Sequence, residues 1–288
     1  MALKDKFLTF PQYLIPQHFI SRAVAKFLGQ RHTWLKNKII SAYIKHYQVD
    51  MNEAAEPEPH AYLDFNHFFT RKLKPELRPI ASASNAVSSP ADGIISQLGP
   101  INNNQIIQAK NINYSLEALL ADPAAETSLS QHFKNGKFMT IYLSPRDYHR
   151  VHMPIDGQLQ LLRYVPGQLF SVNTRTAENV NNLFTRNERA IALFHTAAGP
   201  MAVVFVGAVI VAGIHTAWAG DITPNRSRTI EHWDYKESNI HFKRGEEIGY
   251  FKTGSTIIIL FPEKSMQFLE QLKSEDSMQF GQLIGYLS

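Results

Sequence analysis

The sequence predicts an α+β protein, with amphipathic helices in residues 1–75 (the N-terminal arm) and a mostly antiparallel, barrel-like β body in residues 76–288. Three observations support this prediction. Hydrophobic residues make up 44% of the 288-residue chain and charged residues 19%, which is enough apolar material for a buried core. Apolar residues near the start recur at helical spacing. From Pro79 onward, short β-branched runs alternate with Gly-rich turns.

Two amphipathic helices are predicted within the first 50 residues. Their apolar residues recur three or four positions apart, so they fall on one face of a helix. In chain order these residues are Ile20, Val24, Phe27, Leu28, Leu35, Ile39, Ile40, Tyr43, Ile44 and Tyr47. An acidic linker follows at residues 50–59, and residues 61–70 are typical of one more helix.

The charge is concentrated at the start of the chain. Residues 1–50 hold eight Lys and Arg against two Asp, a net charge of +6, whereas the remaining residues hold 21 basic and 23 acidic side chains, a net charge of −2. A basic arm indicates an anionic partner, either a lipid surface or a nucleic acid. Apolar faces beside Lys and Arg, with Trp34 among them, favour the boundary of an anionic membrane. The alternative is that these helices pack on the body and their charges face water.

Several classes of protein are excluded by composition. The chain has no Cys, which excludes disulfides, thiolate nucleophiles and Cys-ligated metals. A signal peptide is not expected, because Pro11 and Pro16 interrupt the early apolar stretch. Residues 190–220 contain no Asp, Glu, Lys or Arg, but Gly, Pro and His interrupt them, which favours buried strands over a transmembrane helix.

Strands of the β body are predicted where β-branched and aromatic residues cluster between turns. These segments are residues 93–97, 138–143, 159–165, 201–206, 248–251, 256–261 and 282–287. Residues 263–275 are predicted to form a helix.

Five residues are candidates for chemistry. Gly254 and Ser255 stand in a turn before a buried strand, where the serine is either a turn residue or a positioned nucleophile. His149 and His152 are three positions apart, which suits a metal half-site, an acid/base pair or ordinary packing. A zinc site needs a third protein ligand, and no His-Glu-x-x-His pattern supplies one.

Asp92 precedes an apolar strand, where it is either part of a plain turn or a carboxylate that can orient an imidazole. Asp, His and Ser within one β body are the parts of a nucleophilic triad, which is defined by geometry and not by chain order.

Five segments occur together and in order: PADG (residues 90–93), LSPRDYHRVHMP (143–154), YVPGQLFSVN (164–173), NERA (187–190) and GEEIGYFKTGST (245–256). With them the chain resembles the bacterial phosphatidylserine decarboxylases over residues 62–288, with a weaker helical match before. The family usually has Leu-Gly-Ser-Thr at its processing site. Here Thr253 replaces the Leu and the Gly–Ser bond is kept.

The resemblance implies that the enzyme makes its own cofactor. Ser255 attacks the Gly254 carbonyl, and β-elimination followed by hydrolysis leaves a covalent pyruvoyl group and ammonia. The products are residues 1–254 and a chain of 34 residues that begins at the former Ser255. His152 matches the base of this reaction, and Asp92 matches the residue that fixes its tautomer.

The resemblance also implies the reaction on the substrate. The pyruvoyl carbonyl forms a Schiff base with the amine of phosphatidylserine and accepts the electron pair left by CO2, His149 matches the proton donor, and phosphatidylethanolamine is released. Val165, Leu169 and Phe170 belong to a segment that either binds the substrate or packs in the core. No metal is expected.

The expected partners are an anionic phospholipid membrane and phosphatidylserine, with no nucleic acid. The two self-cleaved chains are expected to form a heterodimer, with a higher oligomer left open. The expected location is peripheral, on the cytoplasmic face of the bacterial inner membrane.

Two alternatives predict different behaviour. A Ser-His-Asp hydrolase would use Asp92, His152 and Ser255 on a lipid ester, and its chain would stay uncut. A non-enzymatic module would bind liposomes without turning over any lipid.

Overall fold

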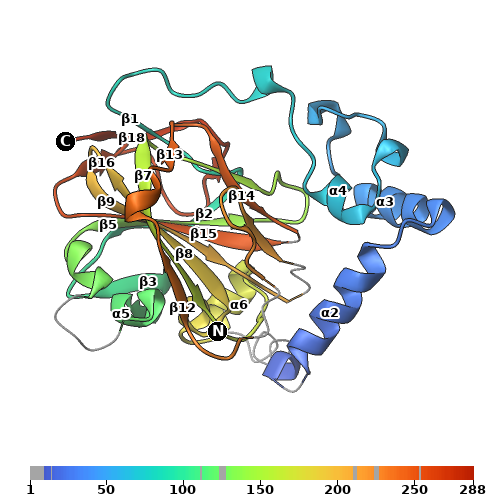
Figure 1. The fold of residues 1–288 in the computed structure, drawn as a ribbon, viewed down its shortest axis with the longest axis horizontal. Coiled ribbons are helices and arrows are strands. Elements are labelled where there is room, and N and C mark those ends of the chain that lie inside the picture. The colour runs from blue at the N-terminus through green and yellow to red at the C-terminus, as the bar shows by residue number, and fades with distance from the viewer. Residues whose placement is uncertain are drawn as a thin grey trace.

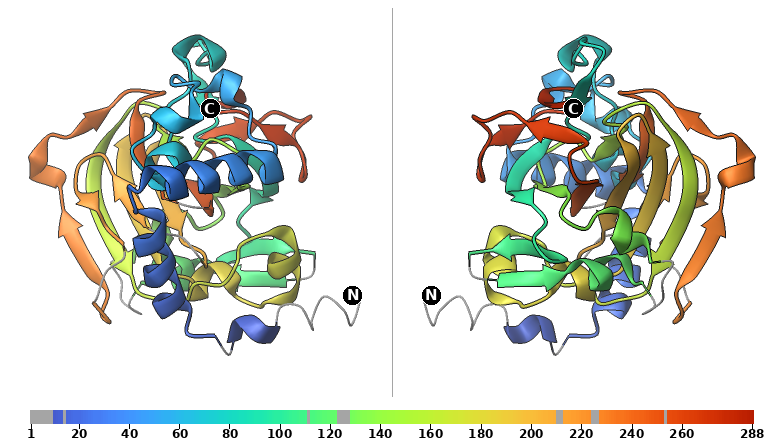
Figure 2. Two further views of the ribbon diagram at one scale, coloured as in Figure 1. Left: turned by 90° about the vertical axis from the view of Figure 1, so that its right-hand side faces the viewer. Right: turned by 90° about the vertical axis from the view of Figure 1, so that its left-hand side faces the viewer.

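The N-terminal arm contains the predicted helices. The computed structural model describes residues 10–13, 15–110, 112–122, 128–209, 213–223, 227–252 and 254–288. Helices α2 (Gln17–Leu28), α3 (Thr33–Tyr47) and α4 (Phe65–Phe69) lie together on one side of the β body (Figures 1 and 2). Both amphipathic helices are confirmed, and the third is shorter than expected. The arm also has 3-10 turns at Phe10–Tyr13, Met51–Glu53, Pro59–Ala61 and Pro75–Leu77.

The ends of the two long helices follow from local sequence. Pro16 directly precedes α2, where its fixed φ and missing N–H are tolerated. Gln48 ends α3 in the left-handed conformation. Aromatic residues of α4 form a small core with Ile40 of α3, so the arm has its own packed centre.

The largest sheet of the body has nine strands, and every pair in it is antiparallel. Its order is β12 (Glu231–Asp234), β7 (Gly157–Val165), β8 (Arg189–Thr196), β9 (Gly199–Val206), β15 (Ser255–Phe261), β5 (Lys137–Leu143), β2 (Gly93–Pro100) and β17 (Ser277–Met278), with β13 (His241–Phe242) also on β7. This path has two ends, β12 and β17. The α+β fold is therefore confirmed, but within the described residues the sheet is open and does not close into a barrel.

Three smaller antiparallel sheets complete the body. They are β11 (Gly220–Asp221), β10 (Ile214–Thr216), β14 (Glu247–Phe251) and β6 (Arg150–His152); β1 (Ala86–Ser88), β18 (Leu283–Leu287) and β16 (Met266–Phe268); and β3 (Gln105–Ala109) with β4 (Ile112–Ser115). Short helices lie at Leu116–Leu120 (α5), Thr174–Asn179 (α6) and Leu183–Arg186 (α7), with 3-10 turns at Leu129–His132 and Lys236–Ser238.

Strand β15 lies between two hydrophobic cores, and all seven of its residues are buried. Ile257 and Ile259 belong to one core, and Ile258 and Leu260 belong to the other. Because side chains alternate along a strand, Ser255 points to the same side as Ile257 and Ile259. This side is the first core, which also contains Val151 of β6.

The seven predicted strands are all present, including the last one as β18. The helix predicted at residues 263–275 is wrong, because Met266–Phe268 pairs with β18 instead. Lys264 and Glu275 also have positive φ angles of 59° and 77°, which an α-helix does not accept. Within the described residues, no helix is both long enough and apolar enough to span a membrane.

Candidate active site

Ser255 is the first residue of β15 and is completely buried. It pairs with Leu143 of β5, and its Oγ has no hydrogen-bond partner among the described residues. A buried hydroxyl without a partner costs about 1–3 kcal/mol. Stability therefore gives no reason for a serine here. Thr253, the departure from the family pattern, lies outside the described residues.

Gly254 borders a cavity of about 410 Å³ between the arm and the body. Its walls are mainly apolar. The arm contributes Val24, Leu28, Ile39, Tyr43, Tyr47 and Phe65, and the body contributes Tyr142, Pro145, Ser171, Val172, Asn173, Ala208, Val209 and Gly254. A ligand with an apolar portion can therefore lie between the helices and reach the Gly254–Ser255 bond.

His149 lies close to the strand position that pairs with Ser255. Its Nε2–H donates to the carbonyl of Ser144 at 3.0 Å, one residue beyond Leu143, and Phe69 stacks on its ring with centroids 4.1 Å apart. Because a carbonyl only accepts, Nδ1 is left as a lone pair, and it has no partner among the described residues. Burial and the charge of Arg71 lower the pKa of His149 to about 3, so the ring is neutral near pH 7.

His152 faces the other way. Val151 between the two histidines points into the core, so alternation along β6 turns His152 to the opposite face. Its Nδ1–H donates to the Gly245 carbonyl at 2.9 Å, and the Tyr148 hydroxyl donates to its Nε2 at 3.0 Å. Burial lowers the pKa of His152 to about 4.

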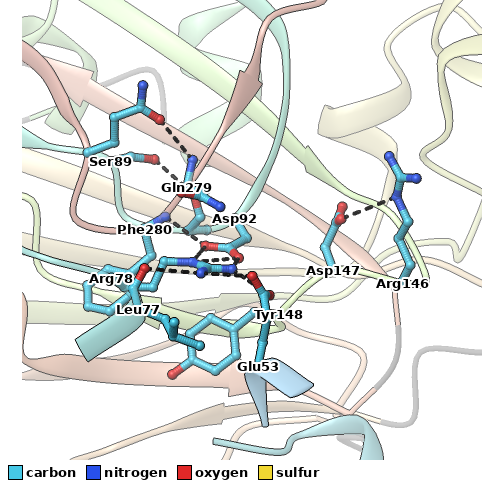
Figure 3. Close-up of polar contacts among 12 residues, drawn as sticks. Glu53, Leu77, Arg78, Ser89, Asp92, Arg146, Asp147, Tyr148, Gln279 and Phe280 are labelled. Atoms are coloured by element: carbon cyan, nitrogen blue, oxygen red, sulfur yellow. Dashed lines mark hydrogen bonds and ion pairs between the residues drawn. The ribbon is translucent and has the colours of Figure 1, made fainter. Parts of the chain in front are cut away.

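The Asp92 carboxylate accepts hydrogen bonds from Arg78 and Phe280 and not from the histidines (Figure 3). Arg78 donates to both of its carboxylate oxygens at 2.6–3.2 Å, and the Phe280 N–H donates to Oδ1 at 2.7 Å. Arg78 also pairs with Glu53 of the arm at 2.8 Å.

The structure does not join Asp92, His152 and Ser255 by hydrogen bonds within the described chain. In the described chain the Gly245 carbonyl, and not Asp92, accepts the hydrogen bond from His152 Nδ1–H. The physical reasons are that Arg78 attracts the Asp92 carboxylate and that β6 turns His152 away from the core side. The catalytic roles of these residues stay predictions.

The segment at residues 164–173 divides between core and cavity. Val165 and Phe170 pack in the second core, and Leu169 is also buried. Its residues on the cavity wall are Ser171, Val172 and Asn173, which follow directly. These three residues belong to the segment that the sequence singled out, but the residues named from it were Val165, Leu169 and Phe170. No signal in the sequence pointed to Arg78 and Phe280, because their contacts with Asp92 join distant parts of the chain.

The comparisons with known proteins agree on one family. A family model described as phosphatidylserine decarboxylase matches residues 65–286, and a second, described as PSD, matches residues 7–48. The chain is 47% identical over 287 residues to the phosphatidylserine decarboxylase proenzyme of Idiomarina loihiensis, covering 99% of this chain and 97% of that protein. The proenzyme of Saccharophagus degradans is 49% identical over 286 residues and 99% of both chains. That of Vibrio vulnificus is 51% identical over 271 residues, 93% of this chain and 94% of that protein.

Proposed function

The chain belongs to the phosphatidylserine decarboxylase family and is an enzyme that decarboxylates phosphatidylserine, and we propose that it does so with a pyruvoyl group made from its own Ser255. The observation that carries this proposal is the Ser255 hydroxyl, which is completely buried, has no partner in the described chain and directly follows Gly254. The relatives are named proenzymes, which agrees with a chain that is processed.

Self-cleavage begins when Ser255 Oγ attacks the carbonyl carbon of Gly254 and the bond from that carbon to the Ser255 nitrogen breaks. The product is an ester with a free amine. Loss of the Ser255 Cα proton then expels the Gly254 carboxylate and leaves dehydroalanine. Water replaces the nitrogen of its imine tautomer, which releases ammonia and leaves the pyruvoyl group. The burial of Ser255 favours elimination over ester hydrolysis because bulk water is excluded.

A serine hydroxyl needs a base at neutral pH, and His152 is the residue we assign. Its low pKa keeps the ring unprotonated, with the lone pair at Nε2. The Tyr148 hydroxyl now occupies that lone pair, and His152 lies on the face of β6 that is turned away from the core. His152 therefore accepts the serine proton only after this hydrogen bond is broken and the imidazole and Ser255 are brought together. Asp92 is assigned to the same step as a carboxylate that supports the position of His152.

The site fits a pyruvoyl group at residue 255, because Ser255 Oγ and His149 Nδ1 are both buried polar atoms without partners in the described chain. Such a group supplies a carbonyl that can bind the substrate amine and accept the electron pair released with CO2. His149 is assigned as the donor to the carbon that loses CO2, and the proton it gives is one taken up at Nδ1, because Nε2–H is held by the Ser144 carbonyl and Nδ1 has no partner in the described chain. The apolar walls of the cavity beside Gly254 suit the acyl part of the lipid.

Intact-mass measurement of freshly purified protein tests this function. We expect two chains, residues 1–254 and a 34-residue chain whose N-terminus is a carbonyl that borohydride reduces. A single 288-residue chain that decarboxylates phosphatidylserine would overturn the pyruvoyl proposal. A serine hydrolase would instead stay uncut and be labelled at Ser255 by a phosphonate.

We also propose that the N-terminal arm lies on an anionic membrane. Phe19, Phe27 and Trp34 on α2 and α3 are 64%, 50% and 73% exposed, although they are large apolar side chains. The Lys38 ammonium lies 5.1 Å from the centre of the Trp34 ring, so cationic and aromatic groups share this surface. Aromatic side chains beside Lys and Arg suit the interface between lipid and water.

Replacing Phe19, Phe27 and Trp34 together by alanine should weaken binding to vesicles that contain phosphatidylserine by roughly 100-fold, at about 1 kcal/mol for each inserted side chain. Co-sedimentation with the vesicles measures this change. In the same assay, raising the salt from 0.1 M to 1 M should weaken binding of the unaltered protein, because salt screens its attraction to the anionic lipid. Trp233→Ala is the matched control, because this half-exposed aromatic residue stands on β12 of the body. Unchanged binding of the triple variant would contradict the proposal.

A further inference from the structure

We propose that Phe280 is the positioning residue that links Asp92 to His152 in self-cleavage. Its backbone N–H donates to Asp92 Oδ1 at 2.7 Å, and its ring stacks on the His152 imidazole with centroids 3.6 Å apart and planes 15° apart. One residue therefore contacts both groups, which no hydrogen bond of the described chain joins directly. The inference rests on the proposed function, because it takes His152 as the base.

Phe280 is held in place from two directions. The next residue, Gly281, donates its N–H to the Ser89 carbonyl at 3.0 Å and has a φ of 83°, a conformation that favours glycine. On the other side, Asp92 is fixed by Arg78, whose guanidinium is itself held by Glu53 (Figure 3). The Asp92 carboxylate thus holds the Phe280 backbone, and the backbone in turn sets the position of the ring that covers His152.

The Phe280 ring covers one face of the His152 imidazole and keeps water away from it. The polar groups on the imidazole are the Tyr148 hydroxyl and the Gly245 carbonyl, and the charges of Arg150 and Glu247 act on it from β6 and β14. Phe280 and His152 also line a cavity of about 320 Å³, where Lys72, Lys74 and Arg78 bring positive charge. Removing the phenyl ring would open the imidazole face to water from this cavity. The pKa of His152, which burial lowers to about 4, should then rise.

Phe280 also joins the two products of cleavage. It lies in residues 255–288, whereas Asp92 and His152 lie in residues 1–254. The stack and the hydrogen bond to Asp92 are therefore contacts between the two future chains. A processing site built from both sides of the scissile bond assembles only after the last 30 or so residues have folded onto the body.

The test is the rate of self-cleavage in the full chain. The protein is made by cell-free synthesis, synthesis is halted, and the two fragments are followed on denaturing gels between pH 4.5 and 8. Phe280→Ala should slow cleavage about tenfold at pH 7 and move the acid limb of the pH–rate profile up by about one to two pH units, toward the ordinary histidine value. Phe280→Tyr keeps a ring over the imidazole and should cleave within about threefold of the unaltered chain.

Two further variants serve as a control for the loss of a phenyl ring and as a substitute for Phe280→Ala if that variant does not fold. Phe268→Ala removes a phenyl ring from the same future chain but not from His152, so its acid limb should not move. If Phe280→Ala does not fold, Phe280→Leu preserves apolar volume and answers the same question. An unmoved acid limb and an unchanged rate in Phe280→Ala, or in Phe280→Leu if only that variant folds, would overturn the inference. If His152→Ala remains uncut in that case, the proposed function stands and Phe280 alone is misassigned; if His152→Ala cleaves normally, the proposed function itself fails.

Discussion

Replacing Ser255 by alanine is expected to leave a single 288-residue chain and to reduce decarboxylase activity to background. The variant loses the one atom that attacks the Gly254 carbonyl, so neither the cut nor the pyruvoyl group can form. The fold should persist, because the lost hydroxyl has no hydrogen-bond partner in the described chain. Intact mass shows the uncut chain, and CO2 release from phosphatidylserine measures the activity.

Ser88 provides a matched control for this experiment. Like Ser255, it is almost fully buried and its Oγ has no partner among the described residues, but it lies on β1 and is remote from Gly254 in the chain. Ser88→Ala should therefore cleave and decarboxylate normally. Ser255→Thr keeps a hydroxyl but adds a methyl group to a site with no exposed surface, so its cleavage should be slowed by crowding. Two fragments from Ser255→Ala, or activity in its uncut chain, would refute the assignment.

Much of the fold could be predicted from the sequence because it depends on local patterns. Helical spacing predicted α2 and α3, and clusters of β-branched residues predicted strands such as β5 and β15. The helix predicted at residues 263–275 was wrong because Met266–Phe268 pairs with β18, and this strand pairing overrides the local helix preference. That the large sheet stays open could not be predicted either. Closure into a barrel depends on which strands pair with one another, whereas the sequence pattern gives only the positions of the strands along the chain.

The site was predicted less completely for the same reason. Residue types alone left several roles open for the Gly254–Ser255 bond and both histidines, and it was the resemblance of their segments to the family that selected them as candidates. The contacts of Asp92 span 14 residues to Arg78 and 188 residues to Phe280, and no spacing rule reports such pairs. The arm's part in the cavity was hidden in the same way, because amphipathic spacing indicates an apolar face but not what covers it.

The position of the cavity connects the arm to the chemistry. Residues of α2 and α3 form one wall and Gly254 stands on the other, so helices that lie on a membrane would bring lipid to the scissile position. Glu53 adds a second connection, since it reaches Asp92 through Arg78. Under the proposed function, lipid entry and chain processing would both take place at this boundary between arm and body.

Replacing each of the two histidines by alanine is expected to block a different step, self-cleavage for His152 and decarboxylation for His149. His152→Ala should remain uncut, because no unprotonated imidazole is left to accept the Ser255 proton. His149→Ala should be cut at least in part, yet lose decarboxylation to background. Intact mass reports cleavage and CO2 release reports turnover, so the two defects are separated in one preparation. Equal loss of cleavage in both variants would contradict the assigned roles.

His149→Gln sharpens this comparison. Its amide N–H can replace the donor that His149 now gives to the Ser144 carbonyl, so the loop before β6 should keep its shape and cleavage should approach normal. An amide cannot transfer a proton near neutral pH, so turnover should still be lost. Burial and Arg71 hold the pKa of His149 at about 3 in the free chain, but a substrate head group with a net charge near −1 would raise it. The anionic substrate thereby favours the protonated imidazole that the reaction needs, and the neutral product removes that influence when CO2 has left.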